Sequence, residues 1–126
     1  MRRNDRLHTQ SSASSVGARG ERLAAAYLRG LGYRVLARNF RTCRAEVDIV
    51  AAHSNDLVFV EVKHWQRTPA AALEYAIGVG KRARIASAAS WFVARRPELA
   101  QRRWRFDVVL LGASGPPVHL RGAFDQ

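Results

Sequence analysis

The sequence predicts an α/β fold in which helices flank a mixed central β-sheet. Three observations support this prediction: helical periodicity near the start of the chain, three consecutive strand-like segments, and a second helical region before the last two strands. The predicted order is α-β-β-β-α-β-β, and such an order favours a sheet with helices packed on it. With 126 residues, 48% of them hydrophobic, the chain can form one core and is too short for a second.

The first helix is expected from Gly17 to Leu31, after a tail. Residues 1–15 are basic and Ser-rich, have little apolar surface and are expected to be disordered, which leaves residues 16–126 as a single domain. Within the helix, apolar residues recur at steps of three and four, the spacing of one helix face. They are Leu23, Ala24, Tyr27, Leu28 and Leu31. Gly30 and Gly32 supply a stop signal.

Strand-like segments follow at residues 33–40, 45–52 and 57–63. Partial alternation in the first places Tyr33, Val35 and Ala37 on one face. The second and third are rich in Val, Ile, Leu and Phe and flank a short polar break, so they predict a β-hairpin.

An Ala-rich segment from about residue 71 to residue 95 has an apolar stripe at helical spacing. Gly78 and Gly80 weaken its middle, which leaves two helices or one kinked helix open. Residues 104–111 are expected to form a fourth strand, and residues 118–121 a short edge strand. Because a helical crossover precedes it, the fourth strand is expected to pair in parallel with an earlier one.

The predicted hairpin carries four charges inside apolar segments, where unpaired charges are costly. With a tight turn centred in the polar break, Asp48 lies opposite Glu61. The same register sets Glu46 opposite Lys63, and a slip of one residue would destroy the separation of charged and apolar faces. The other face then holds the aliphatic residues Val47, Ile49, Val58, Val60 and Val62.

Carboxylates placed opposite one another repel, and a cation between them removes that repulsion. Oxygen ligands of this kind suit Mg²⁺ or Mn²⁺, which can polarise a phosphodiester and activate water. Asp48 and Glu61 are therefore candidate metal ligands, with Glu46 as an accessory residue. Lys63 could orient the attacking water or stabilise transition-state charge. Glu21, on or near the helix face toward the sheet, could reach the metal or its waters.

Purely structural explanations exist for the same residues. Glu46 and Lys63 could form only a cross-strand ion pair. Glu21 could simply favour a helix N-terminus through the macrodipole. The gathering of all these charges around one hairpin of a basic domain favours the site over these alternatives.

The composition favours a polyanionic partner. The formal net charge is +11, from 21 Lys+Arg against 10 Asp+Glu, and only Lys63 and Lys81 are lysines. Arginine presents donors that match phosphate oxygens, although membrane surfaces, acidic proteins or a compositional bias also fit. Cys43 is the only cysteine, which excludes an internal disulfide and a cysteine zinc cluster. No apolar stretch is as long as a membrane span, so a cytoplasmic protein is expected.

The spacing Asp-x12-Glu-x-Lys of Asp48, Glu61 and Lys63 resembles the PD-(D/E)xK nuclease signature. More of the chain resembles the YraN-like family of predicted bacterial endonucleases. The matching segments are Gly17-Ala-Arg-Gly-Glu21, Gly32-Tyr33, Asn39-Phe40-Arg41, Glu46-Val-Asp48, Phe59-Val-Glu-Val-Lys63, Lys81, Arg105-Phe-Asp107 and Ala123-Phe124. The resemblance implies a restriction-endonuclease-like fold, similarity to archaeal Holliday junction resolvases, and a catalytic set of Glu21, Asp48, Glu61 and Lys63.

The chain departs from this family at two places. Ala45 stands where relatives usually have Gly, and His64-Trp65-Gln66-Arg67 follows Lys63 where they commonly have Thr-Arg. His64 or Arg67 could substitute for the displaced basic residue. The candidate nucleic-acid-binding residues are Arg67, Lys81, Arg84 and Arg105. A basic run at residues 95–105 surrounds Trp104; it could grip single-stranded DNA or form a charged surface around a core tryptophan.

Three functions remain in competition at this point. The first is an endonuclease that uses Mg²⁺ or Mn²⁺ to cut DNA, branched or single-stranded DNA included. The second is a nucleic-acid-binding module of the same fold that does not cut, and the third is a protein-interaction domain. The intact Asp48, Glu61 and Lys63 set favours the first. A junction-cutting enzyme needs two sites, so a homodimer would be its expected state.

Overall fold

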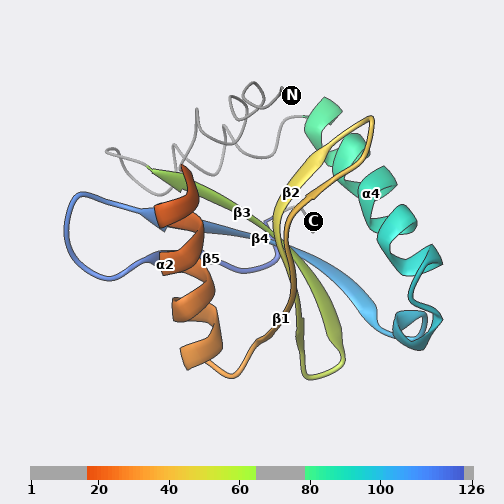
Figure 1. Cartoon of the computed structure of the whole chain (residues 1–126), viewed down its shortest axis with the longest axis horizontal. Coiled ribbons are helices and arrows are strands. Elements are labelled where there is room, and N and C mark those ends of the chain that lie inside the picture. Colours follow the sequence, from red (N-terminus) through yellow and green to blue (C-terminus); the bar gives the residue numbers. More distant parts are fainter. Residues whose placement is uncertain (1–16, 65–78, 124–126) are drawn as a thin grey trace, which may run out of the picture.

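The computed structural model describes residues 17–64 and 79–123 (Figure 1). The expected order of helices and strands is confirmed, with a short 3-10 helix added before the fourth strand. The elements are α2 (Gly17–Gly30), β1 (Arg34–Arg41), β2 (Glu46–His53), β3 (Asp56–His64), α4 (Val79–Ala94), η1 (Pro97–Leu99), β4 (Arg103–Leu111) and β5 (Val118–Leu120). The predicted tail, the first part of the second helical region and Arg67 lie outside the described residues.

The strands form one five-stranded mixed sheet in the order β1-β2-β3-β4-β5. β1, β2 and β3 form an antiparallel meander, and β5 pairs antiparallel with β4. The predicted parallel pairing is confirmed between β3 and β4, from Asp56↔Arg103 to His64↔Leu111. The chain between these strands includes α4, as a parallel connection requires.

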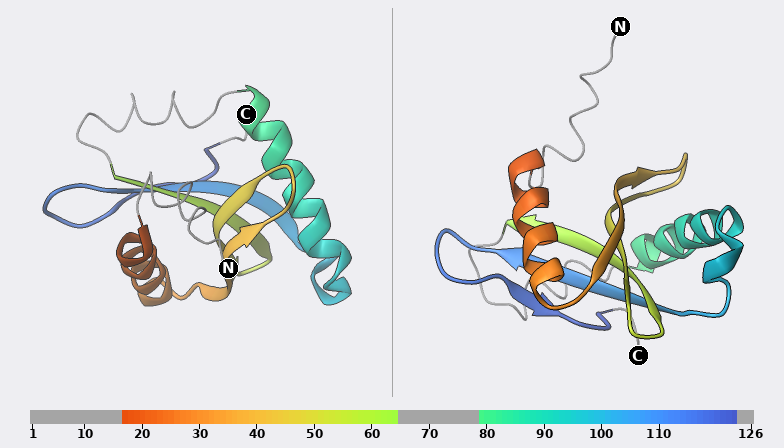
Figure 2. Two further views of the ribbon diagram at one scale, coloured as in Figure 1. Left: turned by 45° about the horizontal axis from the view of Figure 1, so that its top comes forward. Right: turned by 60° about the horizontal axis from the view of Figure 1, so that its bottom comes forward.

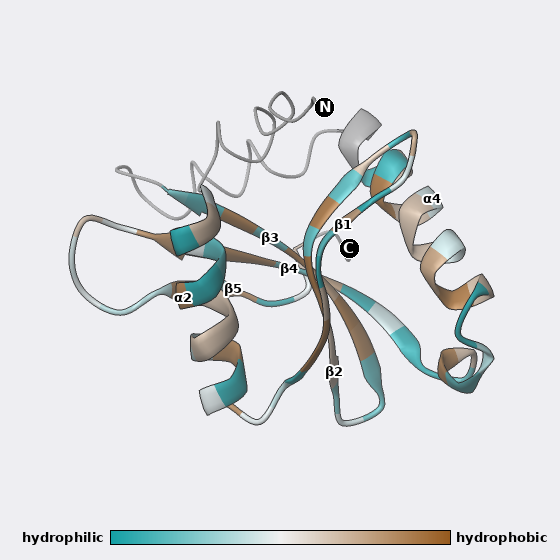
Figure 3. Cartoon of the chain, in the orientation of Figure 1, coloured by the Kyte–Doolittle hydropathy of each residue, from teal (hydrophilic) through white to brown (hydrophobic). Residues whose placement is uncertain are grey.

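Each face of the sheet is covered by one helix (Figure 2). Ala24, Ala25 and Leu28 of α2 pack on alternate residues of β3, including Val60. Phe92 and other residues of α4 pack on the opposite face. Because both faces are buried, β3 and β4 are hydrophobic over most of their length, as Figure 3 shows.

Fewer apolar residues of α2 are buried against the sheet than its sequence pattern predicts. Ala24, Leu28 and the partly buried Tyr27 face the core, as expected. Leu23 and Leu31, also expected on that face, are 52% and 51% exposed. Leu31 lies beyond the helix, which ends at Gly30, because the chain turns away through Gly32 at a φ of 93°. This glycine confirms the predicted stop signal.

The outer strands are less regular than simple alternation predicts. Ala37 was expected on the same face as Tyr33 and Val35, but a register shift between Val35 and Ala37 places Ala37 against the α4 cluster. A bulge of this kind adds one residue to a strand and therefore reverses the faces of those that follow.

A second irregularity lies where Asn39 of β1 faces Asp48 of β2. The pairs on either side are Arg38↔Ile49 and Phe40↔Val47, and Asn39 has a left-handed φ of 57°. Ile49 packs in the α2 cluster and Val47 in the α4 cluster, although they are two residues apart. The prediction that Val47 shares a face with Ile49 is therefore wrong, because the strand rotates at Asp48.

In the two described ranges, no helix is long and apolar enough to cross a membrane.

Candidate active site

The β2–β3 hairpin has the register that its sequence predicts. Its backbone pairs run from His53↔Asp56 next to the turn to Ile49↔Val60. Beyond Val60 the pairing changes, because the backbone N–H of Val62 donates a hydrogen bond to Oδ2 of Asp48 at 2.7 Å. The side chain of Asp48 thus replaces a strand–strand hydrogen bond and points toward β3. The next pair in this register is Asp48 with Glu61, which is the opposition that the sequence predicts.

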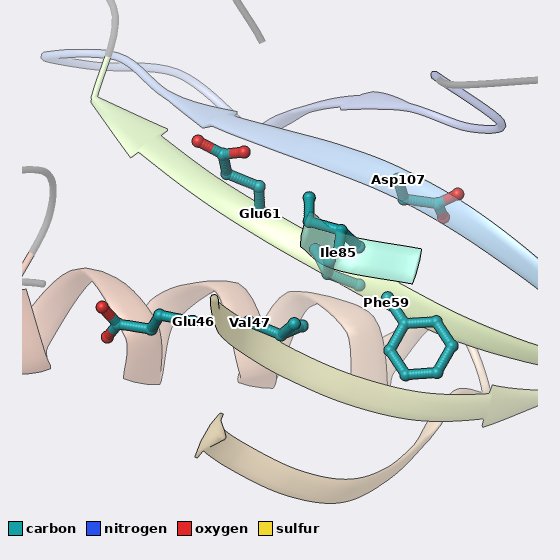
Figure 4. Close-up of a pocket in the computed structure, with 7 residues that line it drawn as sticks. Glu46, Val47, Phe59, Glu61, Ile85 and Asp107 are labelled. Atoms are coloured by element: carbon teal, nitrogen blue, oxygen red, sulfur yellow. The ribbon is translucent and has the colours of Figure 1, made fainter. Parts of the chain in front are cut away.

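Glu61 and Lys63 lie side by side near the end of β3. Nζ of Lys63 is 3.4 Å from Oε2 of Glu61, and both side chains are largely buried. Glu61 also lines a small pocket with Glu46 of β2 and Ile85 of α4. Figure 4 shows the carboxylates of Glu46 and Glu61 toward the same end of this pocket, while the carboxylate of Asp107 points away.

One acid of the hairpin also forms an ion pair with an arginine of β1. Nη2 of Arg41 lies 3.4 Å from Oε2 of Glu46, so β1 contributes a cation to the rim of the site. Glu46 thus has an ion-pair partner in Arg41 of β1, which supports the alternative that Glu46 has a purely structural role.

Glu21 is held toward the sheet by the packing of α2. It is only 7% exposed, and Nε of Arg38 lies 3.9 Å from its Oε1. Burial raises the pKa of Glu21, the charge of Glu46 raises it further, and Arg38 and Arg41 oppose this shift. Glu21 therefore belongs to the same electrostatic group as the hairpin acids, as the sequence predicts from its helix face.

Asp48 is the electrostatic centre of this group. Its pKa is raised to about 7, chiefly by burial and also by the charges of Glu61, Glu21 and Glu46, while the hydrogen bond from Val62 opposes this shift. Negative charge from three neighbours thus converges on one buried carboxyl. A cation bound there would be stabilised by the same charges that disfavour the ionised Asp48.

The donor set fits a hard divalent cation. All four acids offer oxygen ligands, and Mg²⁺ commonly uses only one or two carboxylates together with water and substrate phosphate. Within residues 17–64 and 79–123, no three His, Cys, Asp or Glu side chains already form a metal-holding group. The assignment of Asp48 and Glu61, on the adjacent strands β2 and β3, as metal ligands therefore stays a prediction.

Comparison with known proteins places this site within a family. The model of the uncharacterised protein family UPF0102 matches residues 20–111, a range that contains Glu21, Asp48, Glu61 and Lys63. This chain belongs to the UPF0102 family.

UPF0102 relatives align with nearly the whole chain. A UPF0102 protein of Azorhizobium caulinodans is 43% identical over 116 residues, which cover 92% of this chain and 87% of the relative. One of Nitrobacter winogradskyi is 44% identical and covers 90% of this chain and 95% of its own length. One of Syntrophotalea carbinolica is 41% identical, with 88% and 92% covered.

In this UPF0102 protein, Arg105 has a structural role that contradicts its predicted contact with DNA. It is 9% exposed, and its guanidinium donates hydrogen bonds to both carboxylate oxygens of Asp107 at 3.0 Å. It also donates to Asp56 at 3.0 Å and to the hydroxyl of Tyr33. With its donors directed at these partners, Arg105 joins β4 to β3 and to the residue just before β1.

Asp107 is the internal partner of Arg105, and it has two further partners. Nε2 of His119 lies 2.7 Å from its Oδ2, and the backbone N–H of Gly122 donates to its Oδ1 at 3.0 Å. Burial alone would raise the pKa of Asp107, but these hydrogen bonds and those from Arg105 lower it. Asp56 and His119 were assigned no role from sequence, because nothing local indicates that residues so far apart meet.

The other predicted nucleic-acid contacts fall on or near α4. Arg84 is exposed on this helix, and Lys81 lies in its first turn. Trp104, near the end of the basic run, packs edge-on against Phe59 in the core, with ring centroids 6.2 Å apart. The core-tryptophan alternative is therefore confirmed for Trp104.

Proposed function

We propose that this protein is a metal-dependent endonuclease that hydrolyses DNA phosphodiester bonds at the β2–β3 hairpin. The observation that carries this proposal is the buried carboxylate of Asp48, which accepts a hydrogen bond from Val62 across the hairpin and on which the charges of Glu61, Glu21 and Glu46 act. A lysine stands beside these acids, at 3.4 Å from Glu61. A concentration of buried acids beside a lysine is costly for a fold and typical of phosphoryl-transfer sites.

The sequence resemblance supports the same function. Asp48, Glu61 and Lys63 have the spacing of the PD-(D/E)xK signature, and the YraN-like proteins that the chain resembles are predicted endonucleases. A mixed sheet with its acids on a central hairpin is compatible with the restriction-endonuclease-like fold of that superfamily. Because a fold hosts many activities, the argument rests on the site.

Each residue of the site has a distinct expected part. Asp48 and Glu61 would hold Mg²⁺ or Mn²⁺, and Glu21 would add charge or bind the water around it. A bound ion supplies Lewis-acid polarisation of the phosphodiester. Lys63, held by Glu61, would orient the attacking water and stabilise negative charge that develops on the phosphate oxygens. The water oxygen forms the new bond to phosphorus, the bond to one sugar oxygen breaks, and that oxygen takes up a proton.

The positive charge of the protein favours DNA as the substrate. The excess of eleven positive charges attracts a polyanion, and almost all of it comes from arginine. Arg84 and Lys81 on α4 lie on the helix whose Ile85 lines the pocket of Glu46 and Glu61. Similarity of the YraN-like family to junction resolvases makes branched DNA the first substrate to test.

A cleavage assay tests this proposal. Linear, nicked and four-way-junction DNA are incubated with the protein in Mn²⁺, Mg²⁺ or EDTA, beside Asp48→Ala and Lys63→Ala. We expect cleavage of at least one substrate with Mn²⁺ or Mg²⁺, none with EDTA, and a loss of at least about a hundredfold in both variants. Glu98→Gln, at an acid of η1, serves as the matched control and should cut like the unchanged protein.

The outcomes separate the competing functions. If the protein binds DNA but cuts it in none of the Mn²⁺, Mg²⁺ and EDTA conditions, the protein is a binding module. If cutting survives both Asp48→Ala and Lys63→Ala, the site lies elsewhere or a contaminating nuclease is present. If DNA is released at physiological salt, the basic charge has no role in nucleic-acid binding and the protein-interaction alternative gains support.

A further inference from the structure

A stripe of exposed basic and aromatic side chains runs along α4. It consists of Arg84, Trp91 and Arg95, and we call it the Arg–Trp stripe. All three side chains are exposed. They are spaced by seven and four residues, so they share one side of the helix and of the turn that follows it. At about 1.5 Å per residue the stripe is roughly 16 Å long, enough to contact several nucleotides.

Trp91 is the unusual member of this stripe. It is 49% exposed, although tryptophan is highly buried on average. The guanidinium of Arg95 lies over its ring, 4.0 Å from the ring centroid. Arg95 therefore holds the indole in a defined orientation and presents a stacked, cationic surface to solvent.

The charge around Trp91 selects the chemistry of its partner. The sequence of α4 contains no Asp or Glu, and Arg82 and Arg84 are exposed on it. Arg96, which follows the helix, lies over the ring of Phe92 at 4.2 Å. A flat aromatic group between arginines suits a partner that combines planar rings with negative charge, and a nucleic acid strand has both.

The stripe begins beside the candidate active site. Ile85, next to Arg84, lines the same pocket as Glu46 and Glu61. Ala45 and Phe40, from the turn region between β1 and β2, pack against the α4 cluster. A strand bound along α4 would thus lead directly to the carboxylates.

We propose that the Arg–Trp stripe binds an unpaired, single-stranded segment of DNA next to the site of cleavage. In duplex DNA the bases are stacked inside the helix, so an exposed indole on a convex helix surface can stack only on an unpaired base. Trp91 would stack on such a base, while Arg84 and Arg95 contact phosphates. This inference rests on the proposed function for its substrate, and it narrows that substrate to DNA with a single-stranded arm, flap or open junction.

Binding can be measured without cleavage. A fluorescein-labelled oligothymidine and a duplex of equal length are titrated in EDTA with an Asp48→Asn protein, and anisotropy is recorded. Into this background are introduced Trp91→Ala, Trp91→Phe and Arg95→Ala. Leu23→Ala is the matched control, because Leu23 is a large apolar residue with similar exposure, 52%, on α2. Circular dichroism verifies that each variant is folded.

We expect Trp91→Ala to weaken oligothymidine binding about tenfold, with a much smaller effect on the duplex, while Trp91→Phe retains most of the affinity. Arg95→Ala should lower the slope of log affinity against log salt by about 0.7, the value for one phosphate contact on a single strand. Leu23→Ala should bind like the background protein.

Equal loss for single strand and duplex, or no loss in Trp91→Ala, would overturn the inference. The same holds if polyglutamate competes as well as unlabelled oligothymidine, since the stripe would then fit an acidic protein segment. Because the assay contains no metal, its failure is distinct from failure of the proposed function. If the protein cuts DNA and binding does not depend on Trp91, only the inference about the stripe is rejected. If binding depends on Trp91 and the protein never cuts DNA, only the proposed nuclease activity is rejected.

Discussion

The carboxylate of Asp48 accepts the backbone hydrogen bond of Val62, at 2.7 Å, where a strand–strand bond would otherwise form. The residue therefore has two duties. Its hydrogen bond replaces a backbone hydrogen bond between β2 and β3, and its charge interacts with the charges of Glu61, Glu21 and Glu46. Two effects conflict at this carboxyl: the hydrogen bond from Val62 favours its ionised form, whereas burial and the charges of the three acids favour its protonated form.

The first prediction concerns this conflict. Asp48→Asn keeps an oxygen acceptor for the amide of Val62 and removes the charge, so we expect it to raise stability at pH 8 by a few kcal/mol. Each unit by which a pKa is shifted corresponds to about 1.4 kcal/mol, and the pKa of Asp48 is raised from 3.8 to about 7. Urea denaturation at pH 5 and pH 8 provides the measurement.

The sign of the effect follows from proton binding. The folded protein holds the Asp48 proton more tightly than the unfolded chain, so the contribution of Asp48 falls as pH rises from about 4 to about 7. Asp48→Asn should therefore gain less at pH 5 than at pH 8. An equal gain at both pH values would mean that the pKa of Asp48 is not raised.

The second prediction concerns metal binding by the free protein. Because a cation must displace the proton of Asp48, affinity for Mn²⁺ should rise about tenfold per pH unit below pH 7 and level off above it. At a Mn²⁺ concentration a hundred times its Kd, the stabilisation is about 2.7 kcal/mol, visible as a higher Tm. Asp48→Asn is the control, and a Tm increase that persists in it would place the metal elsewhere.

The third prediction separates Arg105 from the surface arginines. Arg105→Met leaves Asp107 and Asp56 without their shared buried cation, so we expect the free energy of unfolding to fall by about 3–5 kcal/mol. Chemical denaturation measures this loss. Arg84→Ala, at an exposed position of α4, is the matched control and should change stability by less than about 0.5 kcal/mol while weakening DNA binding. If the Arg105→Met protein is stable and no longer binds DNA, the result would support the DNA contact that the sequence predicts for Arg105.

The fourth prediction concerns the backbone at Asn39. Its φ of 57° is accessible to Asn and Gly but strained for β-branched residues. Asn39→Gly should fold with nearly unchanged stability, whereas Asn39→Val should lose roughly 1–2 kcal/mol. Since Asp48 lies opposite this residue, the Mn²⁺ affinity of Asn39→Val should fall as well, measured by isothermal titration. Equal stability of the two variants would mean that the strand does not need this conformation.

The sequence predicted the order of elements and the hairpin register, because both depend on the periodicity of apolar residues. A single register separates charges from aliphatic residues around the turn at residues 54 and 55, and β2 and β3 adopt it. The same reasoning failed at Val47 and Ala37. Their faces depend on irregular backbone at specific residues, which alternation alone does not reveal.

Arg105 shows a second limit of sequence analysis. An arginine in a basic chain was assigned to DNA, yet its partners Asp56 and Tyr33 are 49 and 72 residues away. The parallel pairing of β3 with β4 brings Asp56 to Arg105, and the antiparallel pairing of β1, β2 and β3 brings Tyr33 to the same place. The exposure of Leu23 shows a similar limit: a helix pattern identifies the apolar residues of α2, but it does not tell which of them the sheet covers.

The two outer strands of the sheet have a consequence for how copies of this protein meet. β5 is only three residues long, and β1 carries exposed arginines at positions 34, 38 and 41 together with the left-handed Asn39. Short edges, charged edges and edges with an interrupted backbone all disfavour addition of a strand from another molecule. The sheet is thus protected against edge-to-edge polymerisation, and a dimer that presents two cutting sites to one junction would have to form through helices or loops.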